Sequence, residues 1–151
     1  MSTVPALSAG PRAWFTADHR DCDAHWAAVE AAVDAGQDPA TPWADFDRSM
    51  RRHFEMEEQV LFPAFENETG MTHGPTAVMR HEHAQMRALL DQMGRRADGR
   101  DWSALLDEGD TLMMLVQQHN MKEEGMLYPM MEMHLGHVWR LQVPKLERYL
   151  G

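Results

Sequence analysis

A histidine and glutamate motif occurs twice in this chain. Residues 53–63 read His-x-x-x-Glu-Glu-x-x-Leu-Phe-Pro, and residues 119–129 read His-x-x-x-Glu-Glu-x-x-Leu-Tyr-Pro. A His and a Glu four residues apart lie one turn apart on the same face of a helix, so both can reach one cation. Two independent surface pairs are the alternative. It is disfavoured because both pairs lie in apolar stripes, where unpaired charged groups are costly.

A second repeat joins two other parts of the chain. Asp18-His19 and Glu82-His83 are both acid and histidine pairs, so the two halves of the sequence resemble pseudo-symmetric helix pairs. Together the repeats predict a buried metal site formed by four helices. Its candidate ligands are His19, His53, Glu57, His83, His119 and Glu123.

Helical periodicity dominates the elements that must position these residues. No segment has the pattern of a strand, and short connectors separate the helices. The predicted helices cover about residues 12–35, 41–69, 75–98 and from 101 onward, with Thr41 as N-cap of the second, followed by a shorter tail helix over 138–150 broken at Pro144. We therefore expect an all-α fold, an up-down-up-down antiparallel four-helix bundle. Its domains are a loose arm (1–11), the bundle (12–133) and a C-terminal tail (134–151), helical and packed on the bundle.

The composition excludes several classes of function. The 151 residues carry a net charge of −10, which disfavours nucleic acid and anionic membranes as partners. A single cysteine permits no internal disulfide and fits a reducing cytoplasm. We find no secretory signal at the N-terminus and no apolar run long enough to cross a membrane.

The ligand types restrict the metal. Four imidazoles and two carboxylates suit iron or manganese better than a structural zinc, and better than magnesium or calcium. Two glutamates can bridge two metals. Ferritin-like di-iron bundles use Glu-x-x-His, and no Glu lies three residues before any His in this chain.

At this point the sequence resembles the hemerythrin-like, HHE-type cation-binding family over about residues 12–133. The resemblance rests on Asp18-His19-Arg20, the two repeats, Gly74-Pro75 and Glu82-His83. It implies a non-haem centre of two iron ions with an oxo or hydroxo bridge. Glu57 and Glu123 would be the bridging carboxylates, and the four histidines the terminal ligands. A mixed iron and manganese pair stays open.

The sequence departs from the oxygen-carrying hemerythrins at one ligand. Those proteins have His-x-x-x-His on the third helix, but Arg87 stands four residues after His83. His119 is also followed by Glu at spacing four rather than by Asp at spacing five. A centre without the fifth imidazole is more open, which favours peroxide, nitric oxide or oxygen chemistry, or iron release, over reversible oxygen storage.

Several neighbouring residues could support the ligands. Acidic residues next to the ligands could orient imidazoles, although Glu58 and Glu124 could equally be exposed helix charges. Cys22 fits a buried inert thiol, with a redox role beside iron as the alternative. His81 should point away from the metals, with a ligand role as the alternative, and core filling is the default for Tyr128. The possible second layer comprises Asp18, Cys22, Glu58, His81, Glu82 and Glu124.

These observations predict a cytoplasmic di-iron protein. It would bind or reduce O2, peroxide or NO in protection against oxidative or nitrosative stress, with an unidentified electron donor, as a monomer or dimer. If it is an enzyme, it is a di-iron oxidoreductase. The alternative is a non-enzymatic module for oxygen or iron storage, delivery or sensing. Seven of the 14 methionines lie between Met113 and Met133, for which flexible core packing is favoured over a Cu(I) site or an oxidant sink.

Overall fold

A computed structural model describes residues 5–151, and no strand occurs within this range. The predicted all-α class is therefore confirmed. The elements are η1 (Leu7–Ala9), α1 (Pro11–Asp34), α2 (Ala40–Met56), η2 (Glu57–Leu61), α3 (Phe62–Thr69), α4 (Pro75–Asp98), α5 (Trp102–Lys122), η3 (Glu123–Leu127), α6 (Tyr128–Leu135) and α7 (Trp139–Glu147). None of the described helices combines the length and the apolar character needed to cross a membrane.

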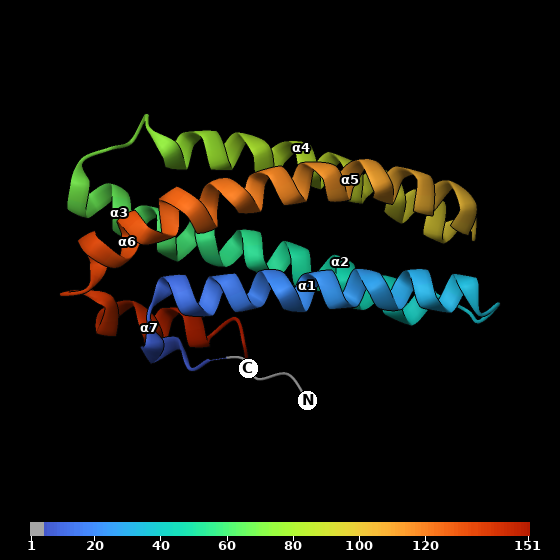
Figure 1. The fold of residues 1–151 in the computed structure, drawn as a ribbon, viewed down its shortest axis with the longest axis horizontal. Helices are drawn as coiled ribbons and strands as arrows, with labels where there is room; N and C mark the ends of the chain where they lie inside the picture. The colour runs from blue at the N-terminus through green and yellow to red at the C-terminus, as the bar shows by residue number, and fades with distance from the viewer. Residues whose placement is uncertain (1–4) are drawn as a thin grey trace.

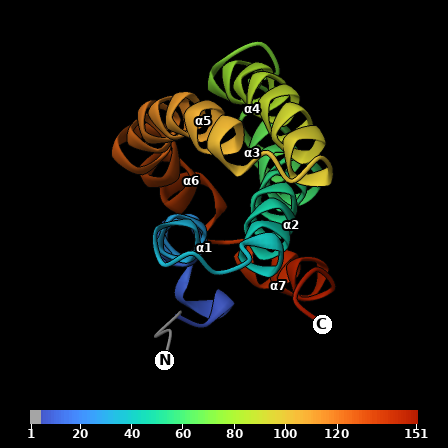
Figure 2. The same ribbon diagram turned by 90° about the vertical axis from the view of Figure 1, so that its right-hand side faces the viewer.

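Four long helices form the body of the molecule. Helices α1, α2, α4 and α5 lie side by side, and each runs opposite to the one before it (Figure 1). Seen end on, they surround a common axis, with α7 outside the α1 and α2 side (Figure 2). The most extensive contacts join α1 to α2 and α4 to α5. The bundle is thus built from two helix pairs, as the internal repeat of the sequence predicts.

Local capping sets where the helices begin. The Asp101 carboxylate accepts a hydrogen bond from the Ala104 N–H (3.2 Å) at the start of α5. The expected N-cap at Thr41 is wrong, because α2 already begins at Ala40. The Asp38 carboxylate accepts the Ala40 N–H (3.0 Å) and provides an acceptor earlier in the chain.

Two apolar clusters lie on either side of a buried polar layer. One fills the end of the bundle formed by the C-terminal half of α1 and the N-terminal half of α2, and includes Val29, Phe46 and Leu90. The other contains Phe15 and Leu61, with residues of α3, α6 and α7. The polar layer between them is therefore shielded from water at both ends.

Each repeat contains one turn of π-helix, which the helical periodicity does not predict. These are η2 and η3, and both begin at a candidate ligand, Glu57 or Glu123. The Phe62 N–H donates to the Glu57 carbonyl, and the Tyr128 N–H donates to the Glu123 carbonyl, five residues back in each case. Such turns occur often at functional sites.

The prolines of the two repeats explain these wide turns. Pro63 and Pro129 have no N–H, and in an α-helix each ring would clash with the carbonyl four residues before it. A wider turn just before the proline relieves this clash. Both prolines then occupy the second position of the next helix, α3 or α6, so the chain continues as a helix.

The two ends of the chain meet beside the bundle. The Trp139 indole N–H donates to the Leu7 carbonyl (2.7 Å), and Leu7 is buried. The arm expected to be loose is therefore packed in this part, while residues 1–4 lie outside the described residues. Helix α7 contacts η1 and η2. The helix also continues through Pro144, where a break was expected.

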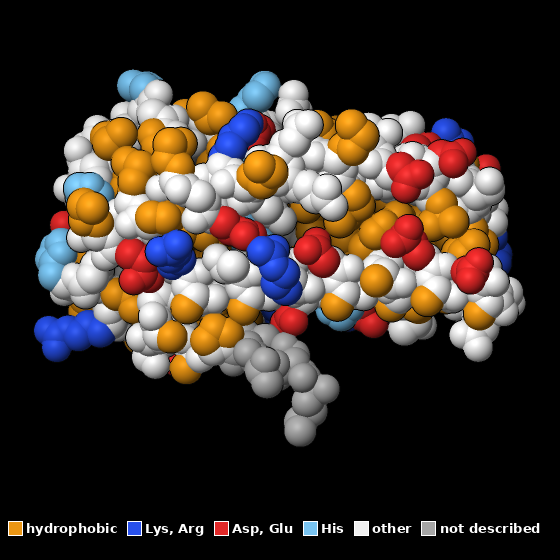
Figure 3. All heavy atoms as spheres, viewed as in Figure 1, with side chains coloured by type: hydrophobic (Ala, Val, Ile, Leu, Met, Phe, Trp, Pro, Cys, Tyr) orange, Lys and Arg blue, Asp and Glu red, His pale blue; other side chains and the backbone are white. Residues whose placement is uncertain are grey.

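The methionines after residue 112 do not all fill the core. Met131 is buried, but four methionine side chains of α5, η3 and α6 are exposed. The expectation that they pack in the core is therefore wrong. The exposed members are Met114, Met121, Met126 and Met133. In Figure 3, apolar side chains are visible over the α5 and α6 surface, between acidic and basic ones.

Candidate metal centre

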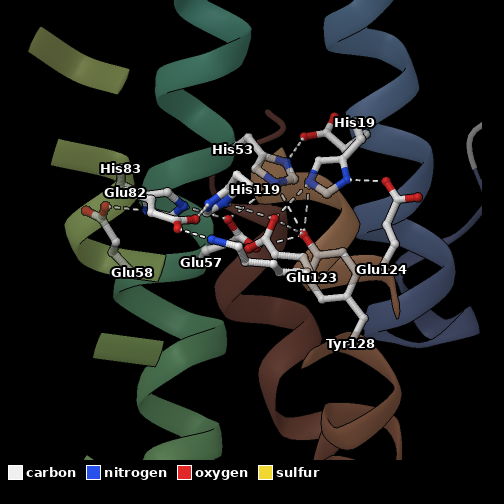
Figure 4. Close-up of polar contacts among 12 residues, drawn as sticks. His19, His53, Glu57, Glu58, Glu82, His83, His119, Glu123, Glu124 and Tyr128 are labelled. Atoms are coloured by element: carbon white, nitrogen blue, oxygen red, sulfur yellow. Dashed lines mark hydrogen bonds and ion pairs between the residues drawn. The ribbon is translucent and has the colours of Figure 1, made fainter. Parts of the chain in front are cut away.

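The structure brings the six candidate ligands together in the polar layer, where each is at most 3% exposed. They come from α1, α2, α4, α5 and the two π turns (Figure 4). Their donor atoms form two groups, and within each group all donors lie within 4.8 Å of one another. The first group is Glu57, His83, His119 and Glu123, and the second is His19, His53 and Glu123.

The two central carboxylates connect the helix pairs. Glu123 Oε1 lies 3.0 Å from His19 Nε2 and 3.1 Å from His119 Nε2. Glu57 Oε1 lies 3.3 Å from His53 Nε2 and 3.1 Å from His83 Nε2. Each carboxylate therefore reaches one imidazole of α1 or α2 and one of α4 or α5, which is the arrangement that bridging ligands need.

Every ligand imidazole is held from behind by an outer carboxylate. A carboxylate only accepts, so the imidazole Nδ1–H donates and Nε2 is the nitrogen that faces the centre, as metal ligation requires. The four pairs are His53 with Asp18 (2.8 Å), His83 with Glu58 (2.7 Å), His119 with Glu82 (2.8 Å) and His19 with Glu124 (2.7 Å).

Each outer carboxylate is in turn paired with a basic side chain. The pairs are Asp18 with Arg52, Glu58 with Arg87, Glu82 with Lys122 and Glu124 with Arg20. Four positive charges thus balance the four outer carboxylates. The two central glutamates carry the remaining negative charge of the site, which suits cationic ligands.

Arg87, four residues after His83, stands where a fifth imidazole was considered in the sequence, and its side chain makes other contacts. The Arg87 guanidinium donates to Glu58 (2.7 Å) and lies 5.4 Å from the centre of the Phe54 ring. Arg87 therefore holds the carboxylate that orients His83, and it contributes no donor to the centre.

Unpartnered polar atoms test whether the residues fit a metal. Four buried donor atoms at the centre have no hydrogen-bond partner, although such atoms are rarely left without one. They are Glu57 Oε1, His83 Nε2, His119 Nε2 and Glu123 Oε2. Cations bound between the two helix pairs would satisfy all four, so the donor set fits a metal centre.

The electrostatics of the cluster favour positive charge. Burial lowers the pKa of His119, but the neighbouring Glu123 outweighs it and raises the pKa to about 9. Burial would raise the pKa of Glu57, but the facing His53 holds it well below its usual range. Glu57 is thus kept ionised inside an apolar bundle.

Tyr128 contacts the candidate ligands, whereas its sequence position predicts only a role in filling the core. Its buried hydroxyl lies 2.8 Å from Glu57 Oε2, 3.0 Å from Glu123 Oε1 and 3.1 Å from His19 Nε2 (Figure 4). Burial and the two carboxylates raise the pKa of the phenol well above its usual range. Five residues after Glu123, an α-helix would place it about 140° around the axis. The π turn returns it to the same face, and Pro129 was the available signal.

Two residues of the predicted second layer make no polar contact with the six candidate ligands, His81 because it is exposed and Cys22 because its thiol packs in an apolar cavity. His81 is exposed on α4, outside the cluster. Cys22 is buried and lines a cavity of about 10 Å³ beside His19 and His53. Burial raises the pKa of this thiol well above its usual range, so the thiolate is disfavoured. A redox role for Cys22 stays a prediction.

Comparison with known proteins identifies the family. The model described as hemerythrin HHE cation binding domain matches residues 10–131. The chain belongs to this family. The predicted resemblance is therefore confirmed, and the His and Glu cluster lies within the matched residues.

Two relatives illustrate the breadth of the hemerythrin-like proteins. An uncharacterized hemerythrin-like protein of Schizosaccharomyces pombe is 32% identical over 122 residues, covering 79% of this chain and 58% of its own. The iron-sulfur cluster repair protein YtfE of Edwardsiella ictaluri is 33% identical over 86 residues, covering 51% of this chain and 39% of its own. The matched regions thus span only part of each relative. No solved structure matches the chain significantly.

Proposed function

We propose that this hemerythrin-like protein is a non-haem di-iron protein on an up-down-up-down four-helix bundle. It binds or reduces a small ligand, O2, peroxide or NO, in the cytoplasm as part of stress protection. The observation that carries the proposal is the pair of donor groups that share Glu123, because one group for each of two ions is what a di-iron centre needs.

The donor chemistry supports iron. Imidazole with carboxylate is a donor set for iron and manganese. Structural zinc sites often use Cys thiolates, and none of the described residues offers a thiolate to this centre. Bound iron would supply an open coordination position and electrons for a small ligand. The outer carboxylates fix the imidazole orientation, and the two apolar clusters exclude bulk water from the reaction.

An iron storage, delivery or sensing module is the second candidate. The observation that favours it is the similarity to YtfE, whose name denotes iron-sulfur cluster repair. The aligned part of that protein covers only 39% of its length, so its activity is not transferred to this chain. Both candidates require the same metal centre and differ in what happens to the ligand.

Elemental analysis tests the metal. Protein purified without added metal should contain about two iron ions per chain, the content of a di-iron bundle. A His119→Ala variant should lose metal, and a His81→Ala variant, changed at an exposed position on α4, should keep it. Stoichiometric zinc in place of iron would contradict the proposal.

Stopped-flow mixing separates the two candidates. The reduced protein is mixed with O2, hydrogen peroxide or NO, and the absorbance of the centre is followed with and without excess reductant. Repeated turnover of one ligand supports the enzyme, and a stable adduct without turnover supports the binding module. Reaction with none of the three ligands contradicts ligand binding as the function.

A further inference from the structure

The two halves of the centre are unequally supplied with donors. One ion position is surrounded by Glu57, His83, His119 and Glu123, whereas the other has only His19, His53 and the shared Glu123 among the His, Cys, Asp and Glu side chains. All of these donors are buried. Glu57 Oε1 approaches His53 Nε2 (3.3 Å) but does not lie within 4.8 Å of all three donors, so this second group contains one donor fewer than the first.

The hydroxyl of Tyr128 lies at this poorer position. It is 3.1 Å from His19 Nε2, 3.4 Å from His53 Nε2 and 3.0 Å from Glu123 Oε1. These are the three donors of the poorer group, and the side chain of Tyr128 is completely buried. The hydroxyl also donates to Glu57 Oε2 of the other group (2.8 Å), so it lies between the two groups but contacts every donor of the second. Among residues 5–151, no other side-chain hydroxyl forms a hydrogen bond with these donors.

The spacing of these atoms is that of ligands around one ion. Two donors that lie about 2.1 Å from a metal and at right angles to each other are about 3 Å apart. The separations of Tyr128 Oη from the three donors, and of His19 Nε2 from Glu123 Oε1 (3.0 Å), are close to this value. One ion could therefore contact all four atoms at ordinary bond lengths.

We propose that Tyr128 Oη is the fourth protein ligand of the metal held by His19, His53 and Glu123. On binding, the phenol O–H bond breaks, the oxygen to metal bond forms, and the proton passes to solution. The inference rests on the proposed metal centre. In the other half, Phe62 occupies the equivalent place in the repeat and its ring stacks on His83 with the centroids 5.6 Å apart. The two metals are thus chemically distinct.

The test uses the only two tyrosines of the chain, Tyr128 and Tyr149. Wild-type protein loaded with iron(III) should have a visible phenolate-to-iron charge-transfer band, with tyrosinate ring modes in its resonance Raman spectrum. Tyr128→Phe should lose the band and the ring modes but still contain two irons. The control Tyr149→Phe should retain both signals. A wild-type protein without the band, or a band that survives Tyr128→Phe, would overturn the proposal.

A second measurement separates this inference from the proposed function. Titration of the metal-free protein with zinc should give the ultraviolet difference spectrum of an ionising tyrosine, absent in Tyr128→Phe. If the purified protein contains no iron but zinc gives this signal, the di-iron function fails and the Tyr128 ligand stands. If iron binds but neither metal gives a tyrosinate signal, Tyr128 only donates a hydrogen bond to the glutamates and the inference fails.

Discussion

Residues 53–63 and 119–129 have the same pattern and the same backbone, with a π turn that begins at the ligand glutamate. At the residue before the proline they differ by one oxygen atom, Phe62 in the first and Tyr128 in the second. Phe62 stacks on His83, whereas the Tyr128 hydroxyl contacts both central glutamates. The comparison shows that a repeated scaffold can present similar donors twice while a single oxygen makes their surroundings different.

The outer carboxylates also differ between the two helix pairs. Asp18, behind His53, is only 1% exposed, whereas Glu82, behind His119, is 19% exposed at its side chain and lies beside a small surface pocket. Water can replace a lost carboxylate at Glu82 but not at Asp18. His53 therefore depends more strongly on its outer carboxylate than His119 does.

The largest expected effect separates the two central glutamates, Glu57 and Glu123. Glu123 belongs to both donor groups and Glu57 to one, so Glu123→Gln should abolish stoichiometric metal binding. Glu57→Gln should retain about one metal per chain, since the His19 and His53 group does not include it. Metal content after dialysis measures both variants. Equal losses would show that the two halves bind metal only as a unit.

The next effect compares the outer carboxylates. Asp18→Ala should weaken metal binding by about 10- to 100-fold, because His53 loses the partner that fixes its orientation. Glu82→Ala should have the smaller effect, since water can reach His119 through the adjacent pocket. Competition with a chelator measures both affinities. A larger loss for Glu82→Ala would contradict the expected order of these two carboxylates.

A third change concerns the contact between α1 and α5, which belong to different helix pairs. A Cβ at Gly109 of α5 would overlap the Trp26 ring of α1, so Gly109→Ala should lower the free energy of unfolding by about 1–3 kcal/mol. Gly94→Ala is the control, because nothing lies near its Cβ and alanine favours the helix by about 0.5–1 kcal/mol. Urea denaturation of the metal-free protein measures both. Equal stability would mean that α1 and α5 can separate freely.

The smallest effect concerns the exposed methionines in and around the second repeat. Replacing the exposed Met114, Met121, Met126 and Met133 by leucine should change the free energy of unfolding by about 0.5 kcal/mol or less, since these side chains leave the core untouched. Metal content should not change. In wild-type protein treated with peroxide, peptide mass spectrometry should find these four oxidised before the buried Met50, Met86 and Met93. Preferential oxidation of the buried three would contradict this order.

Much of the fold and the ligand set could be predicted because both depend on local spacing. The i,i+4 pairs His53 with Glu57 and His119 with Glu123 lie on one helix face whatever the tertiary structure. Breakers such as Gly36 and Gly74-Pro75 end or begin helices by their own backbone preferences. The cap at Thr41 failed because Asp38, a competing acceptor, lies just before it.

The helices, their pairing and the six candidate donors could be predicted, because periodicity and a repeated motif act within a few turns of one helix. The three-dimensional fold was needed to find which carboxylate holds which imidazole, since Asp18 and Glu124 act across helices on residues far away in the chain. It also decided the role of Tyr128. A π turn changes the angle between residues five apart, and that change moves its hydroxyl from the core into the metal centre.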